Sequence, residues 1–135
     1  MPFRLLEHSA DIRVECRGQT IEDLLRSAAE ALYAVALRSR RNATDLTRSI
    51  SLEADSPEDL LVRWLQELIF LLETERFVGA EFRFPTAHNT AVDAEACGYL
   101  CKPEERETEV KAATYHGAAI ERRAGELVAH MLLDL

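Results

Sequence analysis

Apolar and polar residues follow two periods along the chain, and the changes of period divide it into elements. In DIRVECRG (11–18) the apolar residues alternate with charged ones, which predicts a half-buried strand. Beyond it the apolar residues recur every three or four positions, which predicts a helix over about 20–37. Thr20 is a suitable N-cap for this helix, and Asp23 stands at its third position.

A second strand and helix follow the same order. ISLEAD (50–55) alternates, Ser56 and Pro57 mark a helix start, and apolar residues then cover more than one stripe to about residue 74. The remaining chain predicts strands at roughly 78–84, 91–101, 107–116, 118–123 and 127–134. The order predicts an α+β fold, a two-layer sandwich with two helices packed on one face of a mixed, mostly antiparallel sheet.

Composition narrows the class of protein. The 135 residues fit a single domain, 1–135. The net charge of −8 disfavours tight binding to nucleic-acid phosphates, so we expect contact with RNA only indirectly, through a partner. The odd number of cysteines, three, indicates free thiols in a reducing compartment. No apolar run approaches the roughly 18 residues of a membrane span. We therefore expect a cytoplasmic protein, monomeric or weakly oligomeric, without a membrane partner.

Two acids stand near opposite ends of the chain. Asp11 opens the first predicted strand, and Asp134 is the penultimate residue, after an apolar run. Asp11 can be simply a solvated acid at a strand end. If the last strand lies beside the first, however, the two carboxylates converge and repel each other, which a cation resolves. With backbone carbonyls they form an all-oxygen site suited to Ca²⁺, Mg²⁺ or Mn²⁺.

The segment EVKAATYHG (109–117) contains Lys111, one of two lysines beside fourteen arginines. A lysine supplies a compact point charge where an arginine supplies a planar fork. Alternation places Lys111 and Tyr115 on one face and His116 on the other. The alternative is a solvated lysine paired with Glu109. No phosphate-binding loop or serine elbow is present, so the sequence predicts no catalytic residue.

Arginines 38, 40 and 41 form the one local basic stretch. They follow the first predicted helix, where cations suit the carboxyl end of the helix dipole. Contact with RNA or with an acidic partner surface is the alternative.

Five stretches in register resemble the archease family. They are HSAD (8–11) with its strand, TIEDLLRSAAEAL, DSPEDLLVRWLQELIFLLETE, EVKAATYHG and the final Asp-Leu. The resemblance implies an accessory activator of an RtcB-type RNA ligase in tRNA splicing or RNA repair, without chemistry of its own. Such an activator promotes guanylylation of the ligase, which uses GTP and a divalent metal, and thereby its multiple turnover.

The resemblance also implies roles for particular residues. A divalent metal ion, Ca²⁺ first and Mn²⁺ or Mg²⁺ otherwise, would bind Asp11, Asp134 and the carbonyl of Leu135. The histidines at 8 and 116 would lie near it. Lys111 and Asp23 would belong to the surface that acts on the ligase.

Two other functions remain open. A small metal-dependent hydrolase would use Asp11 and Asp134, with His8 or His116 as general base. A chaperone-like binder would keep a partner soluble at stoichiometric amounts and would not depend on Asp134.

Overall fold

Six strands and two α-helices make up residues 11–135, the part of the chain that the computed structural model describes. In chain order they are β1 (Asp11–Gly18), α1 (Ile21–Ala36), β2 (Leu46–Glu53), α2 (Pro57–Glu75), β3 (Phe77–Ala87), β4 (Ala91–Leu100), a 3₁₀ turn (Pro103–Glu105), β5 (Ala112–Arg123) and β6 (Glu126–Asp134). The predicted order of strands and helices is confirmed.

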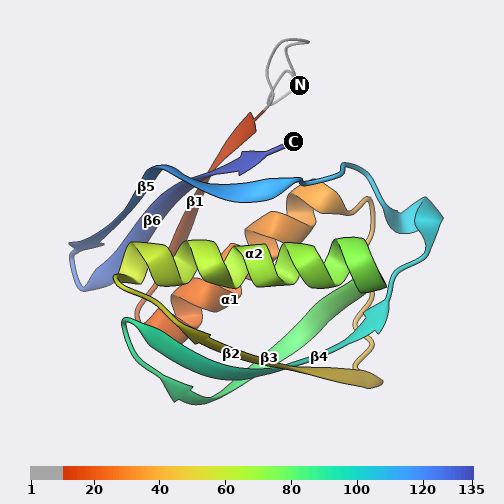
Figure 1. Ribbon diagram of the computed structural model, residues 1–135, viewed down its shortest axis with the longest axis horizontal. Helices are drawn as coiled ribbons and strands as arrows, with labels where there is room; N and C mark the ends of the chain where they lie inside the picture. Colours follow the sequence, from red (N-terminus) through yellow and green to blue (C-terminus); the bar gives the residue numbers. More distant parts are fainter. Residues whose placement is uncertain (1–10) are drawn as a thin grey trace.

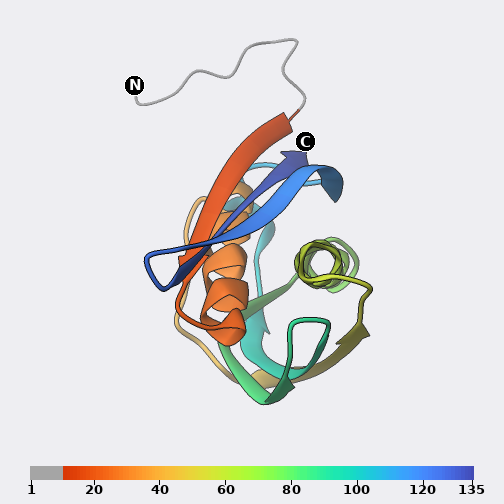
Figure 2. The same cartoon turned by 90° about the vertical axis from the view of Figure 1, so that its left-hand side faces the viewer.

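The strands form two three-stranded sheets, ordered β1-β6-β5 and β2-β4-β3, in which every pairing is antiparallel. Both helices lie between the sheets and contact strands of each (Figures 1 and 2). The α+β class is therefore confirmed, whereas the expected single mixed sheet is two antiparallel ones. The apolar surface of α2 explains the division, because it extends beyond one stripe and needs cover on two sides.

Both helices begin where the capping residues predict. Thr20 Oγ1 accepts the amide of Asp23 at 3.2 Å, and Ser56 Oγ accepts the amide of Asp59 at 3.0 Å. Each bond satisfies one of the amides that a helix leaves unpaired at its start.

The core lies between the helices and the sheets. Trp64 is fully buried, and its indole Nε1 donates to the carbonyl of Leu25 at 2.9 Å, which ties α2 to α1. Tyr33 is equally buried, and its hydroxyl accepts the amide of Gly79 at 3.0 Å. The cysteines at 16, 97 and 101 are buried free thiols.

Residues 107–111 form no strand, contrary to the predicted strand 107–116. The amides of Glu107 and Thr108 donate instead to the carbonyl of Ala36, at the end of α1, and Val110 is fully buried. This segment therefore caps a helix end before β5 begins. The predicted strand 118–123 is the second half of the continuous β5, and β2 begins at 46 rather than 50.

No helix within residues 11–135 has the length and apolar content that crossing a bilayer requires.

Candidate functional site

The two acids predicted to converge lie on neighbouring strands. Asp11 of β1 is the register partner of Asp134 of β6, and β6 is the middle strand of its sheet. On the other side of β6, Ala112 pairs with Asp134, and the amide of Lys111 donates to the Asp134 carbonyl at 2.7 Å. The condition for convergence, that the last strand lies beside the first, is met, and Figure 1 shows the start of β1 next to the end of β6.

Both carboxylates lie on the outer face of this sheet. Met131 and Leu133 of β6 are fully buried in the core, so Asp134, one position further along the strand, and its partner Asp11 face outward. Asp11 is exposed and Asp134 is half-buried. Leu135 packs partly against the core, which anchors the last residue as the apolar run predicts.

The donor set at this edge contains oxygen atoms alone. Carboxylate and carbonyl oxygens suit Ca²⁺, Mg²⁺ or Mn²⁺ rather than softer metals. Residues 11–135 contain no group of three or more His, Cys, Asp or Glu that could hold a metal ion. A cation at this edge would therefore need ligands beyond the two carboxylates, such as water, the Leu135 carbonyl or groups of a bound partner. His8 lies outside the described residues, and His116 is exposed in β5.

Asp23 lies far from this edge. It stands in the first turn of α1, which follows the far end of β1, and its carboxylate pairs with Arg26 at 3.2 Å. β1 has eight residues, so its far end at Gly18 is seven steps from Asp11, roughly 23 Å at about 3.3 Å per residue. The structure thus brings Lys111 to Asp134 and leaves Asp23 at the opposite end of the sheet.

A wide bulge interrupts β5 directly after the Lys111 segment. Thr114 pairs with Leu132 of β6 but Ala119 pairs with His130, so the residues between 114 and 119 have no ladder partner. Gly117 adopts a positive φ of 72° there, a conformation that favours glycine. The bulge interrupts the alternation of inward and outward side chains along this segment, and Tyr115 is 57% exposed there.

Side chains of α2 hold the same segment along its length. Gln66 Oε1 accepts the amide of Ala113 at 3.0 Å, and Asp59 Oδ1 accepts the hydroxyl of Tyr115 at 2.6 Å. The sequence analysis above identifies neither residue. Asp59 is an acid in the first turn of a helix, a common position, and Gln66 carries no local signal, because its role depends on α2 lying beside β5.

Asp59 is only 8% exposed, and its carboxylate accepts two hydrogen bonds besides the one from Tyr115. Its Oδ2 accepts the amide of Asp55 and the Nε of Arg63, both at 3.0 Å. The Tyr115 hydroxyl foremost, then these two donors, lower the pKa of Asp59 to about 2, and the bond to Asp59 raises the pKa of Tyr115. The hydrogen bonds favour the charged carboxylate.

We expect this carboxylate to contribute to acid stability. Its folded pKa of about 2 lies below the unfolded value of about 3.9, so its contribution is complete above pH 4 and is lost as the pH falls towards 2. Asp59→Asn should therefore lose less stability between pH 6 and pH 3 than the wild type, measured by urea unfolding. Tyr115→Phe should change in the same direction by less. Equal losses in all three proteins would contradict the assignment.

The basic stretch is neutralised within the fold. Its three ion pairs join Arg38 to Glu107, Arg40 to Glu30 and Arg41 to Glu105. Each acid belongs to another segment of the chain, so these arginines connect elements of the structure. This arrangement favours the structural interpretation of the stretch over contact with RNA.

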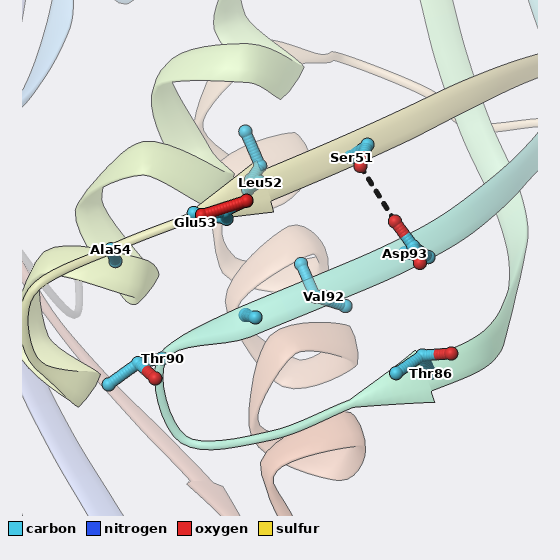
Figure 3. A pocket seen from close by; sticks show the side chains of 9 residues that line it. Ser51, Leu52, Glu53, Ala54, Thr86, Thr90, Val92 and Asp93 are labelled. Carbon is cyan, nitrogen blue, oxygen red and sulfur yellow. Dashed lines mark hydrogen bonds between the residues drawn. The ribbon is translucent and has the colours of Figure 1, made fainter.

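A hollow of about 370 Å³ lies on the other sheet, where β2 ends beside the β3–β4 turn. Figure 3 shows its polar lining, in which Ser51 Oγ donates to Asp93 Oδ1 at 2.7 Å. None of the predicted site residues lines it.

Comparison with known proteins identifies relatives over nearly the whole chain. The model of the Archease protein family matches residues 3–135. Protein archease of Methanosarcina barkeri is 33% identical over 98% of this chain and 95% of its own length. Protein archease of Thermococcus kodakarensis is 33% identical over 96% of this chain and 95% of its own length.

Two solved structures share the fold. The crystal structure of an archease from Thermotoga maritima, described as a possible chaperone, has a TM-score of 0.68 and 22% identity, over 98% of this chain and 97% of that one. The solution structure of protein 1598 from Methanobacterium thermoautotrophicum has a TM-score of 0.70 and 24% identity, over 96% of both chains. By the family match and these sequence identities, the chain belongs to the archease family.

Proposed function

We propose that this protein activates an RtcB-type RNA ligase in tRNA splicing or RNA repair, as a protein partner without chemistry of its own. The family membership supports this role. The observation that carries it is the register pairing of Asp11 with Asp134, with the Lys111 amide bound to Asp134. The edge carries two carboxylates, of which Asp11 is exposed and Asp134 half-buried, and Asp134 belongs to the middle strand of the sheet, so the edge is accessible and firmly held.

The residues of this edge have separate tasks in the proposal. Asp11, Asp134 and the Leu135 carbonyl hold a divalent cation, Ca²⁺ or alternatively Mn²⁺ or Mg²⁺. A bound cation supplies positive charge for phosphate oxygens. Lys111 presents a compact ammonium to a carboxylate or phosphate of the ligase, in a space too small for a guanidinium fork. The edge thereby favours guanylylation of the ligase. Asp23 acts through a second contact, since it lies at the other end of β1.

The test is a turnover assay at limiting ligase. The ligase from the same source, with GTP, Mn²⁺ and a broken RNA, should give multiple products per ligase when a trace of this protein is added, and single-turnover product without it. Asp134→Ala should return the reaction to single turnover, and Lys111→Arg should impair activation without unfolding the protein. Asp93→Ala is the matched control, because Asp93 is an exposed strand acid of the other sheet, and it should activate as the wild type does.

Other outcomes would identify the other functions. Single-turnover product with the wild-type protein would overturn the activator role, and phosphoester hydrolysis by the isolated protein, sensitive to Asp134→Ala, would then support the hydrolase. A stimulation that needs stoichiometric protein and survives Asp134→Ala would support a chaperone-like binder.

A further inference from the structure

One face of α2 follows the segment of the chain that carries Lys111. Every second turn of the helix, a polar side chain binds this segment, in the pairs Asp59–Tyr115, Gln66–Ala113 and Glu73–Arg106. Residues seven positions apart lie on nearly the same face of a helix, so the three contacts form one row, which we call the α2 seam. Helix and segment run side by side along it, in opposite directions (Figures 1 and 2).

Phe70 belongs to the same face of the helix. It lies one turn beyond Gln66 and one turn before Glu73, yet it is 55% exposed. Gln66 binds Ala113, four helix residues advance about 6 Å, and two strand residues advance about 7 Å. Phe70 therefore lies at the level of Lys111 along the seam.

Exposed apolar side chains gather at this seam. Three large ones are exposed within residues 11–135, and two of them, Phe70 and Tyr115, belong to it. The bond from the Tyr115 hydroxyl to Asp59 holds the tyrosine ring in place, which lowers the entropy cost of binding to it. Phe70 lies eleven residues beyond Asp59 on α2, about 16 Å along the helix. Two aromatic side chains at that separation suit a protein surface better than a small ligand.

The charges at the seam narrow the kind of partner. The guanidinium groups of Arg63 and Arg106 are bound by acids of α2, whereas the Lys111 side chain is exposed. A protein that covers Phe70 thus meets an ammonium group, which a carboxylate complements. A second copy of this chain would instead bring its own Lys111 and a further net charge of −8. A nucleic acid would meet the same net negative charge.

We propose that the RNA ligase docks on the α2 seam, with Phe70 in an apolar pocket that has a carboxylate at its rim. This inference rests on the proposed function and names the surface that binds its partner. Buried aromatic side chains supply much of the affinity of protein interfaces, and the two acids of the β1–β6 edge have none to offer. The Lys111 amide binds the Asp134 carbonyl, so a ligase on the seam also reaches that edge.

Calorimetry between the isolated protein and the ligase from the same source tests this. Phe70→Gln should weaken binding by about tenfold or more, as the loss of a central aromatic side chain does. Phe70→Tyr should bind about as the wild type does, because it keeps the ring. Glutamine is a good helix former, so the denaturation midpoint should hold. In the turnover assay, Phe70→Gln should raise the concentration that gives half-maximal activation by the same factor and leave the maximal turnover unchanged.

Leu100→Gln is the matched control. Leu100 is the third exposed large apolar residue, at the end of β4 in the other sheet, and its loss should not change the affinity. Equal affinities of the wild type and Phe70→Gln would overturn the inference, as would equal weakening by Phe70→Gln and Leu100→Gln, or a wild type that does not bind the ligase.

Two further results would assign the seam to another occupant and overturn the inference. One is self-association of the wild type that Phe70→Gln abolishes, measured by sedimentation, and the other is binding of a short oligoribonucleotide that depends on Phe70. The proposed function is judged separately, because a ligase can bind the wild type in the calorimeter without gaining turnovers in the assay.

Discussion

Replacing Trp64 with alanine should lower the free energy of unfolding by about 3–5 kcal/mol, the usual cost of removing a buried aromatic side chain. Trp64 is fully buried between the helices and the β3 strand. Its ring lies 5.3 Å from that of Phe82 and 5.6 Å from that of Phe84, centroid to centroid. Both helices and one sheet therefore lose packing together. Since a domain of this size is stable by only about 5–15 kcal/mol, urea unfolding should show the loss directly.

Trp64→Phe separates the indole hydrogen bond from the packing. Phenylalanine keeps an aromatic ring but leaves the Leu25 carbonyl without its indole donor. We expect a smaller loss than for alanine, about 1–3 kcal/mol. If Trp64→Ala costs less than the phenylalanine variant, the ring does not have the central place in the core that the structure gives it.

The second large effect is expected at Gly98, in the middle strand of the other sheet. An alanine Cβ there would overlap the carbonyl oxygen of Val78 on β3, and would stand 2.8 Å from the carbonyl carbon of Val78 and 3.0 Å from the Cα of Gly79. These contacts are all with backbone, which cannot turn aside as a side chain does. We expect Gly98→Ala to cost about 3 kcal/mol or more, at the upper end of overpacking effects, measured as a loss in the denaturation midpoint.

Gly125→Ala is the matched control for this clash. A Cβ at Gly125 meets no atom within 4 Å, but φ is +81°, so the substitution introduces backbone strain alone, at about 1 kcal/mol. Equal losses for the two variants would contradict the claim that Gly98 is required for space between the strands.

The starts of the two helices were predicted correctly because a few neighbouring residues determine them. Thr20 and Ser56 each accept the amide expected of an N-cap, because capping depends on residues three positions apart. For Asp11 and Asp134 the sequence indicated only that the two carboxylates converge if the last strand lies beside the first. The structure supplies that pairing, which joins strands distant in sequence.

The bulge in β5 and the two separate sheets were beyond reach of pattern alone. The predicted break between strands at residue 117 falls inside the bulge, but alternation cannot show that the residues between Thr114 and Ala119 leave the ladder of one continuing strand. Likewise the roles of Asp59 and Gln66 arise only when α2 lies beside β5. Contacts between distant elements override local preference at these positions.

The pairing of β1 with β6 also has a kinetic consequence. The β3–β4 and β5–β6 pairs join strands that are adjacent in sequence, and each closes a short loop. The β1–β6 pair instead joins opposite ends of the described chain, so it carries the largest loop-closure entropy and raises the contact order of the fold. We therefore expect it to form late in folding, and the paired carboxylates to come together only after the rest of the sheet is in place.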